Sequence, residues 1–515
     1  MDTYTEGTDM FVLEPYFLKV KHQYGLIADF HFRKNPDVPF SRRIQQRSLS
    51  LDRNYRRNVD FHKDKLDRIQ SYVARAETLL SDLKLSGCIE ALKLDRNFVP
   101  VDGFEMSPRV YTFAGGKTGE AQYPGVRDIG PHSLPPTNPK LLFAFRAEDR
   151  QAAVRLANAI SGKKSVGSFP GFEALFRTAV QVDTKPVIIS EFTATEIERV
   201  LLRAQADDPA PLPVFILPDK DESRYLAIKS AFSNAGLPSQ GCTVALLSSD
   251  DELKWSIANI ALQMFCKMGG QPWHVKALKT DTLIVGVSQS HKLNPEGGIE
   301  RFFAFAVLTD SSGAFQKIRV LSETANHDQY IAELKSKLAE ELGTAAESYR
   351  NVVLHASFRL RRDEMASIQD TVEAAAADQA THNFAVLKIN QQTRFFAINP
   401  EANSLVPYGA TGVRLGGNEF LLWFEGISRG RTTVTKAFPG PTHVQKLWES
   451  SEGALSDEEL LQDLINLSGA NWRGFNARNA PVSVYYCHLV AELVHDFQAR
   501  GLPLPAVENL KPWFL

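Results

Sequence analysis

Apolar and polar positions alternate in a regular rhythm between residue 141 and about residue 273. Four short apolar runs, typical of buried strands, read LLFAF, VIIS, PVFIL and TVALL. Each is followed by a stretch with apolar residues at helical spacing: RQAAVRLANAI, TATEIERVLLRA, SRYLAIKSAFSNA and ELKWSIANIALQMF. Strands that alternate with helices predict a parallel, Rossmann-like α/β sheet over residues 141–276. No GxGxxG follows any of these runs, which argues against a dinucleotide cofactor.

The rhythm changes from about residue 280. Three apolar runs follow one another directly (TLIVGV, FFAFAVLT and QKIRVLS), and the helical pattern QYIAELKSKLAEEL, the run VVLHASF and an alanine-rich helix near residues 370–379 come next. Three antiparallel strands, a helix and a fourth strand are the order of a ribonuclease-H-like domain, which we assign to residues 277–515. Further strands (FAVLKIN, RFFAI and FLLWF) and two last helices (DEELLQDLINLS and SVYYCHLVAELVHDF) complete it.

The first 140 residues are organised differently. Residues 1–100 form an α+β, linker-like basic segment: eleven Lys or Arg and five Asp between residues 33 and 68 give a net charge of +6, centred on SRRIQQRSLSLDRNYRRN. Such a block either lines a phosphate backbone or forms a solvated face of strands and a helix, and both readings stay open. Apolar spacing over residues 60–85 predicts an amphipathic helix that Gly87 ends. Residues 101–140 are rich in Gly and Pro and predict an extended linker.

Composition places the chain among ordinary globular proteins. Its 515 residues exceed what one hydrophobic core supports, and the net charge of −2 means that any basic surface is local. The four cysteines lie far apart without a CxxC pair, which argues against a zinc site or disulfide framework and predicts reduced thiols. No signal peptide and no apolar run of spanning length occur, so we expect a cytoplasmic location.

Four donor side chains stand out within residues 141–276. Tyr225 and Lys229 are four residues apart on a predicted helix, so both lie on one side of it. Gln240 follows in the loop that opens the next strand, GCTVALL, and Lys267 ends the helix after that. Two ammonium groups, an amide and a phenol are donors that can converge on one small anion such as a terminal phosphate, and the ring of Tyr225 can also carry a stacked base.

Several segments together resemble a known family. They are the four donors, MGGQPW after Lys267, VGVSQSH at residues 285–291, PVSVYYCHLVAEL and the terminal ENLKPWFL. In order and spacing these segments resemble the prokaryotic Argonautes over roughly residues 105–515, with a MID domain at 141–276 and a PIWI domain at 277–515. The chain is too short for a full Argonaute with a PAZ domain, so it is similar to the short or truncated members.

The resemblance implies a guide-binding role for the four donors. In that family the pocket holds the 5′-phosphate of a guide RNA or DNA, with Tyr225 stacked on the first base and Lys229, Gln240 and Lys267 as further donors. The family often adds a Mg²⁺ ion bridged by the C-terminal carboxylate, here that of Leu515, because a cation between two anions relieves their repulsion. The alternative is that the apolar tail at Trp513 and Leu515 merely caps the core.

The resemblance also implies that the cutting centre is lost. The family motif Gly-Ile-Asp reads Gly286-Val287-Ser288 here, and the segment of a later Asp reads His355-Ala356-Ser357-Phe358. The fourth position survives as His488, and Glu323 is the candidate for a Glu on a mobile loop. Serine hydroxyls are neutral and bind Mg²⁺ weakly, so we expect no paired-metal site, no catalytic residues and no target cleavage. His488, without partners for a metal, is then a packed or hydrogen-bonding histidine.

The partners implied are a 5′-phosphorylated guide, a complementary target DNA and a separate effector in host defence. The effector would be an amino-terminal-like (APAZ-type) module joined to an NADase, nuclease or membrane effector, and residues 1–100 either replace part of it or dock it. Two alternatives stay open. One is an active nuclease with a displaced metal set such as Asp281, Asp363 and His488; the other is a scaffold or binding protein that keeps only the fold.

Overall fold

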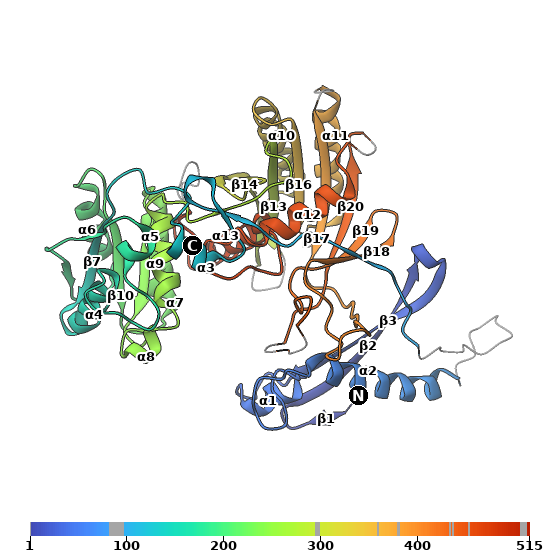
Figure 1. Ribbon diagram of the computed structural model, residues 1–515. Coiled ribbons are helices and arrows are strands. Elements are labelled where there is room, and N and C mark those ends of the chain that lie inside the picture. Colours follow the sequence, from blue (N-terminus) through green and yellow to red (C-terminus); the bar gives the residue numbers. More distant parts are fainter. Residues whose placement is uncertain are drawn as a thin grey trace. The chain divides into compact units, whose positions relative to one another are not determined.

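The computed structural model describes residues 2–515 except 82–96, 294–298, 358–359, 379–381, 432–433, 435–436, 452–453 and 505–511 (Figure 1). The chain forms two compact units. Unit 1 joins residues 1–107 to residues 389–446, and unit 2 joins residues 108–388 to residues 447–515. Both are mixtures of helices and strands, and the predicted α/β class is confirmed.

Unit 1 begins with a small antiparallel sheet. Its strands run in the order β1 (Thr3–Tyr4), β2 (Gly7–Leu18) and β3 (Gln23–Lys34). Helices α1 (Arg42–Arg47) and α2 (Phe61–Ser81) follow, so the predicted helix begins as expected, whereas Gly87 lies outside the described residues. Phe30, Ile69 and Tyr72 form the core between this sheet and α2.

The second part of unit 1 consists of residues 389–446, which were predicted to lie within the domain at 277–515, and of one strand from residues 101–107. Its strands are β20 (Thr442–Glu449, which begins in this unit), β19 (Glu419–Trp423), β18 (Thr411–Gly416) and β4 (Gly103–Glu105), paired in that order. The run RFFAI, predicted as a strand, is irregular. Its Phe395 instead packs against the apolar cluster of Leu18 and Trp423. Residues 389–446 join the N-terminal segment through contacts between residues some 400 positions apart in the sequence. Local periodicity does not predict such contacts.

Residues 101–140 are not the extended linker that their Gly and Pro content predicts. They contain β4, β5 (Tyr111–Thr112), β6 (Thr118–Gly119) and α3 (Gln122–Asp128). In unit 2, β5 pairs with β6 and with β12 (His274–Val275). The wholly buried ring of Phe113 packs against Gly125, where a Cβ would come within 2.0 Å of it. A buried aromatic residue thus folds a segment whose composition favours a loop.

The Rossmann-like part of unit 2 is the parallel sheet that the alternating pattern predicts. The strands are β7 (Lys140–Arg146), β8 (Gln181–Val182), β9 (Val187–Ile189), β10 (Leu212–Leu217) and β11 (Gln240–Thr243), and all the pairings are parallel. The helices are α4 (Arg150–Ile160), α5 (Phe172–Phe176), α6 (Ala194–Gln205), α7 (Glu222–Asn234), α8 (Asp250–Leu253) and α9 (Ile257–Lys267). One strand is shifted: β11 ends at Thr243, and most of TVALL forms a turn.

The ribonuclease-H-like order is also confirmed. Strands β13 (Thr282–Leu293), β14 (Ile299–Asp310) and β15 (Phe315–Thr324) are antiparallel, and β16 (Asn351–Ser357) returns parallel to β13 after α10 (His327–Ala346). Helix α11 (Arg362–Asp378), strand β17 (Asn383–Asn390) and helices α12 (Asp457–Leu467) and α13 (Val482–Ala499) complete it. No helix in the described part of the chain is long and apolar enough to cross a membrane.

The two faces of β13 are covered by different helices. Val285 and Val287 point to the core that α10 and α11 share, with Leu334 and Ile368 among its buried members. The residues of β13 that alternate with these two valines face α13. Helix α13 approaches β13 closely because residue 286 is glycine: a Cβ there would lie 2.3 Å from the Ser483 carbonyl oxygen. The Cys487 thiol donates a hydrogen bond to the Gly286 carbonyl at 3.0 Å. Gly286 therefore sets how close α13 comes to the sheet.

Replacing Gly286 by Ala should lower the free energy of unfolding by about 1–3 kcal/mol, because the added methyl group displaces α13 from β13. The matched control is Gly343→Ala on α10, where a Cβ meets no atom within 4 Å. That change should stabilise the helix by about 0.5–1 kcal/mol. Urea unfolding measures both, and equal midpoints for the two variants would contradict the tight packing at Gly286.

Candidate functional site

Three elements of the Rossmann-like part bring the four predicted donors together. Helix α7 begins at an Asp221 cap, whose carboxylate accepts from the Ser223 amide at 2.8 Å, and it carries Tyr225 and Lys229 one turn apart. Gln240 opens β11, and Lys267 ends α9. The Lys267 ammonium donates to Gln240 Oε1 at 2.8 Å, and the Lys229 ammonium lies 6.0 Å from the centre of the Tyr225 ring.

The two lysines are buried without a carboxylate side chain beside them. Lys229 is 3% exposed and Lys267 is 1% exposed, and no Asp or Glu among the residues that the structure describes forms an ion pair with either. Burial lowers the pKa of Lys229 well below its usual range, and the charges of Lys267 and Arg473 lower it further. Burial also lowers the pKa of Lys267, to about 7. The site therefore holds two buried amines whose charged forms no carboxylate side chain stabilises.

The last residues of the chain fold back onto these donors. Lys229 Nζ donates to the Trp513 carbonyl and lies 3.4 Å from the Leu515 main-chain oxygen. The side chains of residues 513–515 are buried, and the Phe514 ring packs against Tyr486 at 5.0 Å between ring centres. The tail therefore caps the core through its side chains and contacts Lys229 through its main chain, and the metal-bridging role of its carboxylate stays a prediction.

Arg473 adjoins the same site and was missed by sequence reasoning. Its positive charge acts on Lys229, on Lys267 and on Tyr225, whose pKa burial raises while Arg473 opposes the rise. The Arg473 side chain donates to the Tyr485 hydroxyl at 3.4 Å, and its carbonyl accepts from Gln263 of α9 at 2.9 Å. Arg473 lies in a loop before α13, where no periodicity or motif marks it.

The two serines predicted to stand at the positions of the family carboxylates lie side by side. Val287 pairs with Ala356 on the parallel strands β13 and β16, which places Ser288 next to Ser357. Both serines are buried. Phe358 lies outside the described residues. His355 is also buried, so its pKa falls to about 3, and its Nδ1 hydrogen-bonds to Ser483 Oγ at 2.8 Å.

His488 lies on α13, one residue after the cysteine that contacts Gly286. Its Nε2 atom lies 2.9 Å from Glu492 Oε1, one helical turn further on. Of the four catalytic positions of the family, the predicted candidates are thus two adjacent serines, a histidine on the covering helix, and Glu323. Glu323 is exposed on β15, which β14 separates from β13.

The alternative metal set is not assembled. Asp281 precedes β13 and accepts from the Asn351 amide at 2.9 Å, so it lies about 23 Å from Ser288 along an extended strand. Asp363 lies on α11, where it contacts His327 Nε2 at 2.8 Å. That helix covers the other face of the sheet from α13 and His488. Among the described residues, no three His, Cys, Asp or Glu side chains are grouped as for a metal ion.

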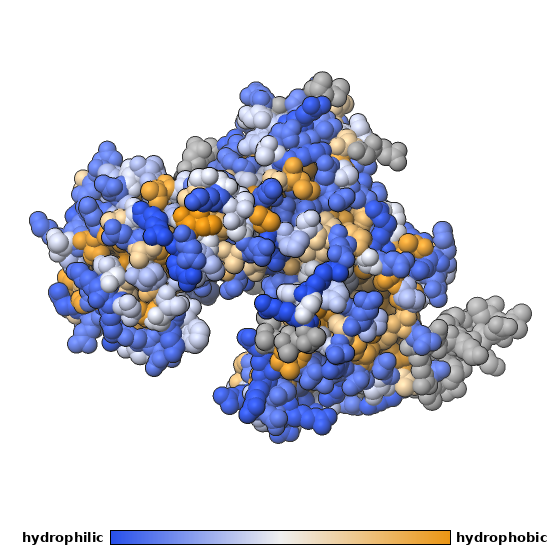
Figure 2. Space-filling view, in the orientation of Figure 1, coloured by the Kyte–Doolittle hydropathy of each residue, from blue (hydrophilic) through white to orange (hydrophobic). Residues whose placement is uncertain are grey.

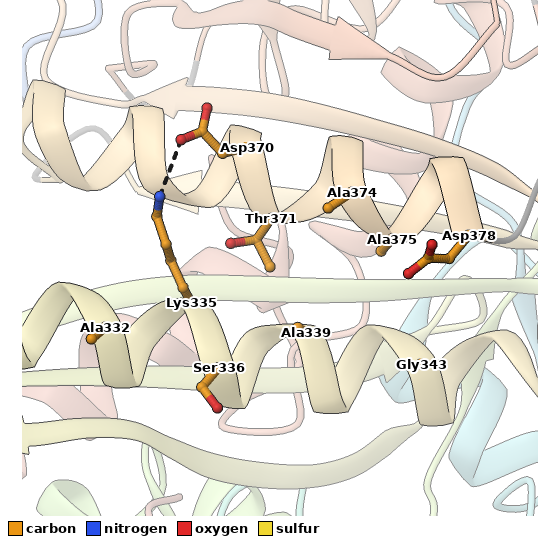
Figure 3. A pocket seen from close by; sticks show the side chains of 10 residues that line it. All are labelled: Ala332, Lys335, Ser336, Ala339, Gly343, Asp370, Thr371, Ala374, Ala375 and Asp378. Atoms are coloured by element: carbon orange, nitrogen blue, oxygen red, sulfur yellow. Dashed lines mark hydrogen bonds and ion pairs between the residues drawn. The ribbon is translucent and has the colours of Figure 1, made fainter.

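A cavity of about 620 Å³ lies away from the donors, between α10 and α11 (Figure 3). Small side chains line most of it, and the ion pair between Lys335 and Asp370, at 3.1 Å, spans the two helices. Its wall holds no group from α7, β11 or α9. The cavity is therefore separate from the donor cluster.

Comparison with known proteins places this geometry in a family. The family model for the Piwi domain matches residues 212–498, which is more than half of the chain and includes α7, β11, α9 and the ribonuclease-H-like part. The chain belongs to the Piwi-domain family. Among relatives of this Piwi-family chain, the "Piwi protein" of Archaeoglobus fulgidus is 26% identical over 353 residues, covering 64% of this chain and 81% of the relative.

More distant relatives extend the match toward the N-terminus. The "Protein argonaute" of Cereibacter sphaeroides is 23% identical over 464 residues, covering 80% of this chain and 59% of the relative. The structure of Clostridium butyricum Argonaute bound to a guide DNA and a 19-mer target DNA matches 96% of this chain and 66% of that chain, with a TM-score of 0.66 at 15% identity. Drosophila Piwi matches 88% and 62%, also with a TM-score of 0.66. These structures share an Argonaute-like fold with the chain, which spans about three fifths to two thirds of their length.

The lowered pKa of Lys267 should make stability depend on pH. Between about pH 7 and the ordinary lysine pKa of 10.5, Lys267 keeps its proton in the unfolded chain and has lost it in the folded chain. The free energy of unfolding therefore rises with pH, by up to about 1.4 kcal/mol per pH unit for this residue. Lys267→Met should reduce the slope and leave the part that Lys229 contributes, whereas Lys220→Met, at an exposed position, should keep the full slope. Urea unfolding in phosphate-free buffer between pH 7 and 10 measures the slopes, and parallel slopes for all three proteins would contradict the shift.

Proposed function

We propose that this chain is a guide-directed nucleic-acid-binding protein that holds the 5′-phosphate of a short guide strand and does not cut its target. The observation that carries the proposal is the pair of buried lysines, Lys229 and Lys267, held beside Gln240 without a carboxylate side chain as partner. A cluster of donors buried in this way is destabilising alone and becomes favourable when an anion enters.

A terminal phosphate fits this cluster better than other small anions. It carries a charge of about −1.5 to −2 at pH 7 and presents three acceptor oxygens, so it can accept from both lysines and from Gln240 at once. Arg473 adds a further charge at the rim, because its side chain is only partly buried. Tyr225 borders the cluster and is also partly exposed, which supports the proposal that its ring stacks on the first base of the strand.

We further propose that a Mg²⁺ ion accompanies the phosphate. Mg²⁺ takes oxygen ligands, and the main-chain oxygens of Leu515 and Trp513 meet at this site. The ion would reduce repulsion between the phosphate and negatively charged oxygens near it. The protein would supply only these two main-chain oxygens as ligands, so the other ligands of the ion would come from the phosphate and water. Affinity for a 5′-phosphorylated strand that is equal in EDTA and in Mg²⁺ would remove the ion from the proposal.

The proposed absence of cutting rests on the chemistry at Ser288 and Ser357. Paired-metal hydrolysis needs anionic ligands that hold two cations close together, and two neutral hydroxyls on adjacent strands supply no charge for this. Specificity would then come from base pairing between guide and target, while the protein holds backbone and shape. The chain would recognise complementary invader DNA in host defence and signal to a separate effector. Purification from the native host, with sequencing of bound strands and identification of co-purified proteins, tests both partners.

Replacing both buried lysines, as Lys229→Ala with Lys267→Ala, should weaken binding of a 5′-phosphorylated strand at least a hundredfold, because about 1.5–3 kcal/mol is typical for each charged hydrogen bond. Binding of the same strand with a 5′-hydroxyl should change little. Fluorescence anisotropy with 3′-labelled strands measures the four affinities.

The control for this experiment is Lys163→Ala with Lys185→Ala, which removes two lysines from exposed positions of unit 2. The control should keep the preference for a 5′-phosphate. A wild-type chain that binds phosphorylated and hydroxyl strands equally, or a double variant that keeps the preference, would refute the pocket.

Guide-loaded protein should leave a labelled complementary target intact in Mg²⁺ and in Mn²⁺, because Ser288 and Ser357 cannot hold a metal pair. Denaturing gels follow the target over time, and a filter-binding assay on the same samples verifies that the target is bound. A product cut at one position opposite the guide would show that this chain is a nuclease with another ligand set.

A further inference from the structure

Residues 40–58 of unit 1, named here the arginine segment, carry a concentrated positive charge. The segment contains six arginines, no lysine and one aspartate, a net charge of +5 in a chain whose net charge is −2. It comprises α1 and the loop that follows it, and the surface around α1 is strongly hydrophilic (Figure 2). A local charge of this sign needs either counter-charges from the same protein or a polyanionic ligand.

Hydrogen bonds within the segment fix the conformation of the loop. The one carboxylate of the segment, Asp52, accepts from the backbone amides of Asn54 at 2.9 Å and Arg56 at 2.8 Å. Leu51 and Arg57 form an antiparallel bridge, and the side chain of Asn58 donates to the Leu49 carbonyl at 3.1 Å. The Asp52 carboxylate therefore holds the turn through backbone amides, and the arginines project from a loop of defined conformation.

Two arginines of the segment have partners within unit 1. Arg43 pairs with Glu6 at 2.8 Å, and the guanidinium of Arg47 stacks over the Tyr4 ring at 3.6 Å. The other four are exposed, and none of them forms an ion pair with a carboxylate in the described part of the chain; they are Arg42, Arg53, Arg56 and Arg57. Four guanidinium groups are therefore open to a ligand.

Two aromatic side chains stand among these arginines. Phe40 is 71% exposed, and Tyr55, at the tip of the turn between Arg53 and Arg56, is 44% exposed. Tyr55 has φ of +58°, in the left-handed region that side chains other than glycine rarely adopt. A backbone conformation of this kind persists where the surrounding hydrogen bonds impose it, and such positions are common at binding sites.

We infer that the arginine segment is a nucleic-acid-binding surface that contacts the phosphate backbone independently of the strand's 5′ end. Guanidinium groups match phosphate oxygens in pairs, and an exposed tyrosine between them can stack on an unpaired base. The use of arginine alone favours phosphate recognition over general charge attraction. A membrane surface is disfavoured because α1 has only six residues and supplies no extended apolar face. The inference does not depend on the pocket at Lys229 and Lys267.

The test uses the full chain and strands with a 5′-hydroxyl, so that the 5′-phosphate pocket makes no contribution. The variant Arg53→Ala, Arg56→Ala, Arg57→Ala should bind a duplex on the order of tenfold more weakly, with a plot of log Kd against log salt that is shallower by about 2–3 units. The charge-matched control is Lys163→Ala, Lys185→Ala, Lys220→Ala at exposed positions of unit 2. It should keep the wild-type slope.

Three results would overturn the inference. The first is a triple variant with the affinity and salt slope of wild type, and the second is an equal loss in the lysine control. The third is an equal loss of binding to a polyglutamate peptide, which would make the segment a docking site for acidic proteins. Because the three side chains are exposed, the thermal midpoint of the arginine variant should match that of wild type, which separates loss of binding from loss of fold.

Tyr55→Gly provides a second, independent variant. Glycine adopts positive φ without strain, so the thermal midpoint should not fall, while the aromatic ring is lost. Binding of a single strand should weaken several-fold and binding of a duplex should change less, because only unpaired bases are free to stack. Unchanged affinity for the single strand would remove Tyr55 from the surface.

Discussion

The structure of the candidate site depends on the burial of two like-charged side chains beside each other. Removing an ammonium group from water costs several kcal/mol, and in this chain Lys229 and Lys267 are both removed without a carboxylate side chain to offset the cost. Helix α7, the start of β11, the end of α9 and the returning C-terminal residues all converge to hold this arrangement. A ligand of opposite charge would relieve this constraint, and the proposed terminal phosphate would supply both the charge and the acceptors.

The ribonuclease-H-like part contrasts with this site, because the two side chains that its strands bring together are neutral. Gly286 still allows α13 to pack closely on β13, and the parallel pairing of β13 with β16 still places two side chains next to each other. Those side chains are serines, so the position carries no negative charge for metal ions. Under the proposed function, holding a strand and cutting it are separated in this chain: the buried lysines would hold the strand, and the neutral serines would hold no metal ions.

Local sequence patterns were sufficient for the parts of the fold that local physics determines. The spacing of Tyr225 and Lys229 placed them on one helical face, and the order of strands and helices identified both α/β parts. Contacts distant in sequence were not accessible in this way. Arg473 reaches the pocket from a loop without periodicity, and residues 389–446 join unit 1 through packing of Phe395 against Leu18 and Trp423. The turn at TVALL shows that an apolar run alone does not distinguish a strand from a buried turn.

Proton uptake on binding tests the central claim most directly, because it reports the charge state of the buried lysines themselves. A phosphate entering the pocket should restore the protons that burial has displaced. Isothermal titration calorimetry at pH 8, in buffers with different ionisation enthalpies, measures the number of protons taken up per strand. The account predicts uptake of about one to two protons with a 5′-phosphorylated strand and none with its 5′-hydroxyl counterpart. Tight binding of the phosphorylated strand without proton uptake would contradict it.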